Sequence, residues 1–145
     1  MFQAICVASI AVLTVIDMLT KYAAVVTVKV NGPKEFLFGL FQFRYAENTG
    51  AAFSSFSNNT LVLTAFSGLI LLADVILLLT HKIKSNFINA CIVLACAGGL
   101  GNLIDRIRLG YVVDFIEPLF IDFAVFNFAD CLVCIGSVMI IIYIM

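Results

Sequence analysis

Apolar residues dominate four long stretches of this sequence, and most charged residues lie between them. The stretches cover about residues 2–26, 60–80, 85–104 and 125–145. Each is close to the roughly 20 apolar residues that a helix needs to cross a hydrocarbon core of about 30 Å. Helices are predicted because a lone strand would leave its backbone groups unpaired in lipid. The pattern predicts a single domain, residues 1–145, with the fold class of an all-α membrane protein with four transmembrane helices.

The connecting segments indicate how the helices are oriented. Residues 27–59 and 105–124 are expected as loops on one side, and residues 81–84 as a short loop on the other. The short loop reads HKIK, and its two lysines favour the cytoplasm, although the opposite loops carry more basic residues in total. Four spans then place both termini in the cytoplasm. Residues 2–26 are interpreted as a retained span and not a cleaved signal peptide, because no basic residue precedes them.

The first outer loop has a pattern of its own. Aromatic and aliphatic residues alternate loosely over about residues 33–46, which predicts a short strand or hairpin. The apolar character of this segment indicates that it rests on the membrane surface.

Composition supports a membrane protein and excludes several other classes. The chain is 63% hydrophobic and 12% charged, whereas a soluble domain is about half apolar and a quarter charged. A net charge of −1 provides no basic surface for nucleic acid. The five cysteines all lie in the predicted spans, where apolar surroundings disfavour the thiolates that redox or zinc sites need. No metal or other cofactor is therefore expected.

Ionisable residues inside spans are costly, so each is a candidate for function. Asp17 and Lys21 are spaced i, i+4 and can pair on one helix face, which favours a structural role. Asp74 is expected near the cytoplasmic interface, where a structural role is also favoured. Asp130 lies about 15 residues before the end of the chain, roughly 22 Å of helix rise, and Asn102 reaches a similar depth. These side chains are thus expected in the outer leaflet.

Asp130 admits two interpretations. Asn127 can cap the last helix with Asp130 in its first turn, where the helix dipole favours a negative charge. Alternatively, Asp130 pairs with Asp114, which stands in the apolar run VVDFI without a local structural reason. Two carboxyl groups in an apolar setting, one protonated and one ionised, can act as general acid and base on an attacking water. A transporter or lipid-binding protein that lacks hydrolysis is the competing hypothesis.

Five motifs together resemble the lipoprotein signal peptidases, the type II signal peptidases of bacteria. The motifs are DMLTK (17–21), NTGAAFS (48–54), GGLGNLIDR (98–106), VVDF (112–115) and FNFAD (126–130). The four-span plan of that family covers the whole chain. The resemblance implies an aspartic endopeptidase of the bacterial inner membrane, with its active site near the extracytoplasmic face. Its substrates would be diacylglyceryl-modified prolipoproteins, cleaved just before the lipidated cysteine.

The resemblance also implies roles for individual residues. Asp114 and Asp130 match the catalytic pair, and Asp17 and Lys21 match a polar pair that supports the fold. The residues that match those lining and supporting the site are Asn48, Gly50, Asn102, Arg106 and Asn127. The segment 33–46 would form the family's small extracytoplasmic sheet. Expected partners are membrane lipids and globomycin-type inhibitors, and a monomer is expected.

From the residues alone, several roles stay open. Arg106 can hold the substrate backbone, orient a carboxylate, or extend its charge to lipid headgroups. Asn102 and Asn127 can bind substrate carbonyls or cap helix ends. Asp105 and Glu117 are interpreted as solvated loop charges.

Overall fold

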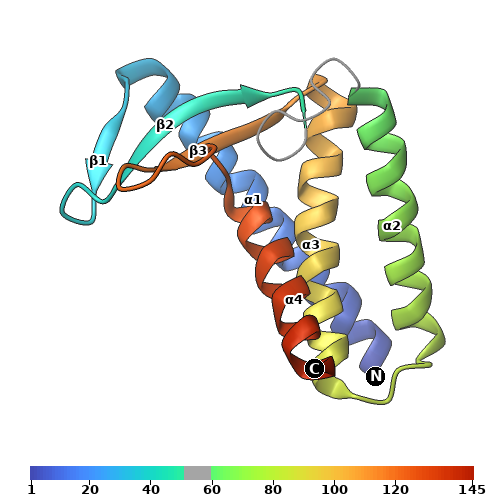
Figure 1. The fold of residues 1–145 in the computed structure, drawn as a ribbon. Coiled ribbons are helices and arrows are strands. Elements are labelled where there is room, and N and C mark those ends of the chain that lie inside the picture. The colour runs from blue at the N-terminus through green and yellow to red at the C-terminus, as the bar shows by residue number, and fades with distance from the viewer. Residues whose placement is uncertain (51–59) are drawn as a thin grey trace.

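The computed structural model of the chain describes residues 1–50 and 60–145. The helices are α1 (Phe2–Asn31), α2 (Thr60–Thr80), α3 (Asn86–Leu109) and α4 (Phe128–Ile144), and the strands are β1 (Lys34–Phe36), β2 (Phe41–Asn48) and β3 (Val112–Pro118). The helices run side by side, and the sheet extends sideways from one end of them (Figure 1). Both termini and the α2–α3 connection lie at the other end.

The membrane fold expected from the apolar pattern is confirmed, with one difference in helix length. Three helices, α1 to α3, are long and apolar enough to span a membrane. The fourth, α4, is apolar but has 17 residues, roughly 25 Å of rise. It starts only at Phe128 because Phe126 forms an extended bridge with Ile116. The expected apolar stretch 125–145 is therefore helical over most, but not all, of its length.

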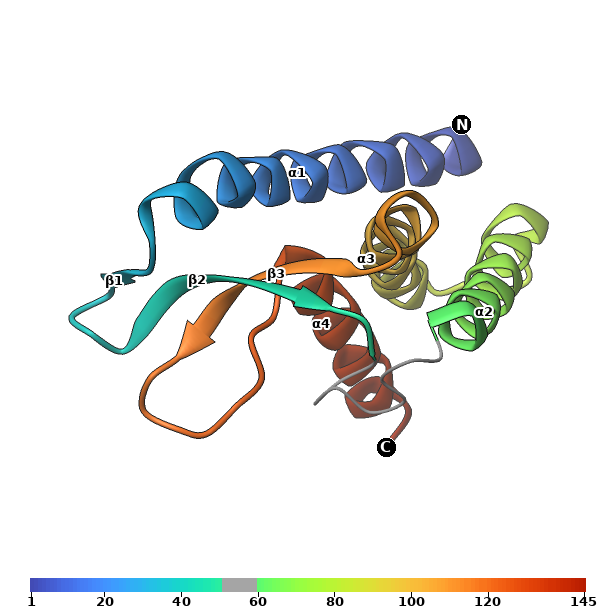
Figure 2. The same cartoon turned by 90° about the horizontal axis from the view of Figure 1, so that it is seen from above.

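The central helix is α3, and the other three helices pack around it (Figure 2). In an 18-residue apolar stretch of α3, half of the residues are buried, whereas in the corresponding stretch of α2 only 6% are. Most of the surface of α2 therefore faces outward. Glycines permit the closest approach: a Cβ on Gly98 would lie 2.2 Å from the carbonyl oxygen of Ala129, and one on Gly136 would lie 2.5 Å from that of Cys91. Small residues at such contacts are typical of membrane helix pairs.

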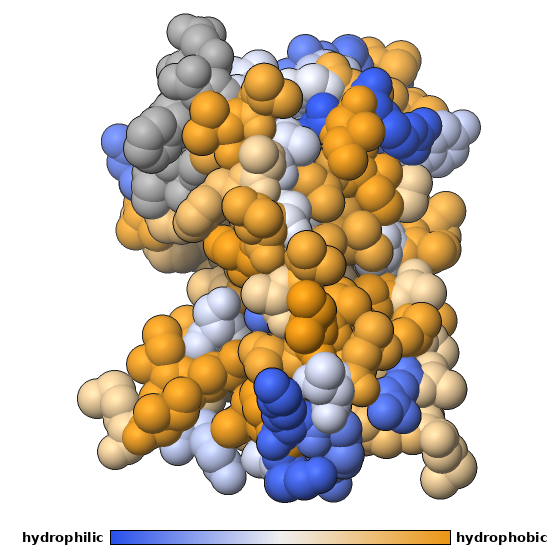
Figure 3. Space-filling model, turned by 90° about the vertical axis from the view of Figure 1, so that its right-hand side faces the viewer, coloured by the Kyte–Doolittle hydropathy of each residue, from blue (hydrophilic) through white to orange (hydrophobic). Residues whose placement is uncertain are grey.

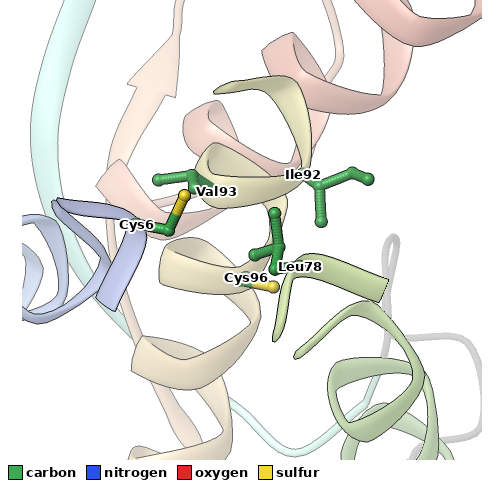
Figure 4. Packing of buried hydrophobic residues seen from close by; sticks show 5 residues of the cluster. All are labelled: Cys6, Leu78, Ile92, Val93 and Cys96. Carbon is green, nitrogen blue, oxygen red and sulfur yellow. The ribbon is translucent and has the colours of Figure 1, made fainter. Parts of the chain in front are cut away.

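A small apolar cluster joins α1, α2 and α3 near the end that holds the termini. Its members are Cys6, Leu78, Ile92, Val93 and Cys96 (Figure 4). The cysteines contribute as small apolar side chains, and all five cysteines of the chain are free.

The outer surface fits a lipid environment along the helices. On the face shown in Figure 3, apolar residues cover most of the middle, and hydrophilic residues gather toward the two ends. Exposed side chains along α2 include Leu61, Leu69 and Ile76. In lipid, such exposure is favourable because the surroundings are apolar.

The sheet is antiparallel, in the order β1-β2-β3, with an irregularity between Phe43 and Ala46. The hairpin expected in residues 33–46 is β1 and β2. The third strand differs from the expectation of a loop over 105–124: α3 continues to Leu109, Gly110 ends it at φ 81°, and β3 follows. Asp114 therefore lies on a paired strand. The remainder of the NTGAAFS motif, residues 51–54, and the end of the expected loop 27–59 fall outside the described residues.

Candidate active site

Asp114 is held on β3 opposite Ala46 of β2, with 2% of its surface exposed. Its Oδ2 accepts a hydrogen bond from Asn48 Nδ2 at 2.9 Å, and its Oδ1 accepts one from Asn127 Nδ2 at 2.6 Å. This carboxyl is thus buried, and each of its oxygens accepts a hydrogen bond, one from β2 and one from the N-cap residue of α4. Burial, and then the negative charge of Asp130, raises the pKa of Asp114 to about 7.

Asp130 lies in the first turn of α4 and takes part in a capping box. Asn127 Oδ1 accepts from the backbone N–H of Asp130 at 2.9 Å, and Asp130 Oδ2 accepts from the backbone N–H of Asn127 at 3.0 Å. The second oxygen, Oδ1, accepts from Asn102 Nδ2 at 2.8 Å. The capping interpretation therefore describes the structure, and it also leaves Asp130 facing the polar site.

Asn127 joins the two carboxyl groups. Its side chain is fully buried, and its amide donates to Asp114 while its backbone N–H donates to Asp130. The same Nδ2 lies 3.1 Å from Asn102 Oδ1. The fold thus brings together a carboxyl on β3 and a carboxyl on α4, and one residue contacts both of them.

A cavity of about 250 Å³ opens between the two carboxyls. Asp114 and Asp130 line it together with Asn48, Asn102, Arg106 and the 123–126 segment. A larger cavity of about 450 Å³ shares Asn102, Arg106 and Asp130 with the first and continues between α2, α3 and α4 as far as Asp74. Both carboxyls can therefore meet a ligand, and the site is continuous with space among the membrane helices.

Arg106 links the helices to the segment after β2. Its Nη2 donates to the carbonyl oxygen of Gly50 at 3.1 Å, and the backbone N–H of Gly50 donates to Asn48 Oδ1 at 2.9 Å. The Nε of Arg106 is buried without a hydrogen-bond partner among the described residues. Arg106 is thus oriented toward the site and lines both cavities, which differs from a side chain directed only to headgroups.

The polar pair of the first span lies directly behind the site. Lys21 Nζ is 2.8 Å from Asp17 Oδ2, 3.0 Å from Asp105 Oδ2 and 2.9 Å from Asn102 Oδ1. The i, i+4 pairing expected from the sequence is present, but it belongs to a larger network. All of these side chains are almost completely buried.

Two carboxylates lie elsewhere than the sequence indicated. Asp105 is not a solvated loop charge: it is on α3, is 7% exposed and pairs with Lys21. The sequence contained one signal for this position: Asp105 follows Asn102 by three residues, and residues with that spacing lie on the same face of a helix. Glu117 is on β3, where it pairs with Arg44 at 2.8 Å and accepts a hydrogen bond from Gln42.

Comparisons with known proteins find similar sequences and a similar fold. A family model described as signal peptidase (SPase) II matches residues 9–145. A lipoprotein signal peptidase of Streptococcus agalactiae serotype Ia is 38% identical over 126 residues, 87% of this chain and 82% of that protein. One from Streptococcus pyogenes serotype M6 is 33% identical, over 94% and 90%. A solved bacterial membrane enzyme superposes with TM-score 0.88 at 31% identity, covering 97% of this chain and 87% of that one.

Proposed function

This chain belongs to the signal peptidase II family, and from that membership we propose that Asp114 and Asp130 are its catalytic pair. The protein is an aspartic peptidase that removes signal peptides from prolipoproteins. The competing hypothesis of a transporter or lipid-binding protein without hydrolysis is not favoured. One observation carries the catalytic assignment: Asn127 donates hydrogen bonds to both carboxyls, and both carboxyls line one cavity.

The two carboxyls take different protonation states in this proposal. Asp114 is the acid, because burial holds its pKa near 7 and keeps a proton available at neutral pH. Asp130 is the ionised base, since two N–H groups donate to its oxygens and the N-terminus of α4 favours negative charge. A water molecule between them is activated by Asp130 and attacks the scissile carbonyl carbon.

The proton transfers balance over two steps. Water gives a proton to Asp130 as its oxygen bonds to the carbonyl carbon, and Asp114 protonates the carbonyl oxygen, which yields a gem-diol. Asp130 then protonates the amide nitrogen, one hydroxyl returns its proton to Asp114, and the C–N bond breaks. The products are a signal peptide with a free carboxyl group and a mature chain with a free amino group on its lipidated cysteine.

Neighbouring polar residues support this chemistry in the proposal. Asn48 and Asn127 hold Asp114, and Asn102 holds Asp130. Arg106 lines the cavity and donates to the Gly50 carbonyl oxygen. The larger cavity between α2, α3 and α4 is the space we assign to the segment before the scissile bond, because it leads directly from Asp130 into the membrane.

The protein is a bacterial membrane protein, and we propose an inner-membrane orientation with both termini in the cytoplasm. Both termini lie beside the α2–α3 connection, which carries Lys82 and Lys84, as the positive-inside rule favours. Asp114 and Asp130 then lie toward the extracytoplasmic face. A diacylglyceryl group anchored in the outer leaflet would hold its cysteine at this depth. Globomycin-type inhibitors are expected to occupy the same cavity, and the enzyme is expected to act as a monomer.

Cleavage of a lipidated prolipoprotein by purified protein tests the catalytic assignment. Asp114→Asn and Asp130→Asn should each lose at least 10²-fold in rate, because acid–base catalysis by a positioned group contributes roughly that much. Asp122→Asn is the matched control, since Asp122 is an exposed carboxylate on the same side. Wild-type rates in both site variants would refute the assignment of the pair.

A further inference from the structure

Lys21 is a buried cation that lies among three oxygens from two helices. Its side chain is 4% exposed, and its ammonium group lies within 3.0 Å of three oxygens, from Asp17, Asp105 and Asn102. Two of these contacts are ion pairs with carboxylates, and the third is a hydrogen bond to the Asn102 amide oxygen. An ammonium group has N–H donors and no acceptor, so it can only donate to these oxygens.

The two carboxylate partners of Lys21 hold the chain next to the two catalytic aspartates. Asp17 Oδ1 accepts from the backbone N–H of Ala129 at 2.9 Å, one residue before Asp130. Asp105 Oδ2 accepts from the backbone N–H of Val113 at 3.2 Å, one residue before Asp114. A lysine that served only to join helices would not need partners at these two positions.

The third partner of Lys21 is the side-chain amide of Asn102, and this contact fixes the orientation of that amide. Asn102 Oδ1 accepts from Lys21 and from Asn127 Nδ2, and Asn102 Nδ2 donates to Asp130 Oδ1. If the amide were reversed, its NH₂ group would face two other donors and its oxygen would face a carboxylate. Because ammonium can only donate, it excludes that reversed orientation.

We propose that Lys21 is a positioning residue for hydrolysis, which acts through Asn102, Asp17 and Asp105 to set the placement of Asp130 and Asp114. The inference rests on the proposed catalytic roles of those two residues. It assigns Lys21 a part in the reaction beyond support of the fold, and it explains why a cation is buried behind the site despite the cost of its desolvation.

A double-mutant cycle tests whether Lys21 acts through Asn102. Lys21→Met is expected to lower kcat by about 100-fold with little change in KM, because small displacements of reacting groups cost about that much. In an Asn102→Ala background the same change should cost less than about 5-fold, since coupled residues are non-additive. Equal factors in both backgrounds would overturn action through Asn102.

Lys29→Met is the matched control on the same helix. Lys29 pairs with Glu47 at 3.0 Å, and its side chain is 47% exposed. We expect its kcat and KM to stay near those of the wild type. A loss equal to that of Lys21→Met would show a general effect of removing a lysine from α1 and would contradict the proposal.

The dependence of kcat/KM on pH gives a second readout of the Lys21 charge near the site. The charge of Lys21 lowers the pKa of Asp114, so its removal should raise that pKa and move the loss of activity to higher pH. The other charged groups packed around this region are Asp17, Asp105, Arg106 and Asp130. An unchanged profile in folded Lys21→Met would count against the proposal.

A second variant guards against misfolding. Asp17→Asn combined with Lys21→Met removes both charges of the closest pair, and the new amide oxygen can still accept from the N–H of Ala129. This double variant should fold and should remain slow. Wild-type kcat in it, or loss of fold in both variants, would leave Lys21 with a structural role only.

The outcomes distinguish this inference from the proposed function. If Asp130→Asn still cleaves at the wild-type rate, the catalytic pair itself is wrong. If Asp130→Asn is inactive and Lys21→Met has wild-type kcat, only the inference about Lys21 fails.

Discussion

Asp114 and Asp130 carry the same functional group in different surroundings. Asp114 is enclosed by a strand and two amides, whereas Asp130 belongs to a helix N-terminus and is partly exposed to a cavity. This contrast is what an acid–base pair requires, because two carboxyls in equivalent sites would compete for one proton. Burial, and then the negative charge of Asp130, raises the pKa of Asp114, whereas the amides of Asn48 and Asn127 lower it.

The pH dependence of cleavage is a prediction at the residue scale. The pKa of Asp114 is raised to about 7, so its proton is present below that pH and is lost as the pH rises through it. If Asp114 acts as the acid, kcat/KM should fall above about pH 7. Initial rates with a lipidated peptide between roughly pH 5 and 9 measure this.

Asn48→Ala serves as the control for this assignment. The amide of Asn48 donates to Asp114 and lowers the pKa of that carboxyl, so its removal should move the decline to higher pH. A decline that moves to lower pH, or a flat profile in the wild type, would contradict Asp114 as the acid.

At the scale of elements, the site depends on how closely α4 approaches α3. Gly98 and Gly101 leave no space for side chains: a Cβ on Gly101 would lie 2.3 Å from Asp17 Oδ2. The start of α4 therefore fits against α3 and α1 at the level where Asp130 meets Asn102. The close packing of these helices therefore also sets the relative positions of Asp130 and Asn102.

Gly98→Ala should destabilise the protein and displace the start of α4. The added Cβ would meet the backbone oxygen of Ala129, which cannot move independently, and such overpacking costs about 1–3 kcal/mol. Thermal unfolding in detergent measures the loss. Gly99→Ala is the adjacent control, because nothing lies within 4 Å of its Cβ position. Equal melting temperatures for the two variants would argue against the close contact.

The β1–β2 hairpin presents an unusual apolar tip. Leu37 and Phe38 have φ values of 50° and 59°, which bulky residues rarely adopt, and Phe38 is fully exposed. Phe120, from the segment after β3, lies edge-on to Phe41 and extends this apolar surface. Backbone strain that is kept at an exposed aromatic residue suggests a functional contact.

We expect this tip to insert into the outer leaflet. A fluorophore attached at Phe38→Cys in bilayer nanodiscs should be quenched strongly by lipids that carry a quencher in the upper acyl chain. A fluorophore at Glu35→Cys, an exposed position on the same hairpin, should be quenched less. Equal quenching by lipid, or strong quenching of Phe38→Cys by aqueous iodide, would contradict insertion.

At the scale of the whole molecule, the polar network and the apolar cluster lie at opposite ends. The network with Asp114 and Asp130 is at the end that carries the sheet, and the cluster around Leu78 and Cys96 is near the termini. The buried charged groups of the polar network thus lie toward the end of the helices that carries the sheet. Toward the termini, the apolar cluster holds α1, α2 and α3 together, with hydrogen bonds from Gln3 to Leu79 and from Thr14 to Ala97.

The membrane orientation gives a prediction at this scale. Lys34→Cys, at the exposed start of β1, should react with an impermeant maleimide in intact spheroplasts. Lys82→Cys, in the α2–α3 connection, should react only after lysis. The unchanged chain shows the background from its five native cysteines, three of which are buried. Labelling of Lys82→Cys in intact spheroplasts would reverse the proposed orientation.

The sequence alone was enough for the class of protein, the four helices and the catalytic candidates. Long apolar stretches determine membrane helices because lipid penalises every unpaired backbone group, and this holds without knowledge of neighbours. The i, i+4 spacing of Asp17 and Lys21 is equally local. The resemblance assigned Asp114 and Asp130 as the catalytic pair. It rests on short motifs, which are recognised from their residues and their order along the chain.

Only the tertiary structure decided how these residues meet. β3 escaped detection because its pairing partner, β2, lies more than 60 residues earlier, and strand formation depends on such partners. The sequence places Asp105 in a loop because the apolar stretch ends before it. In the structure, α3 continues to Leu109, and Asp105 is buried against Lys21. The link from Lys21 through Asn102 to Asp130 joins three helices, and contacts of this kind have no signature in any single segment.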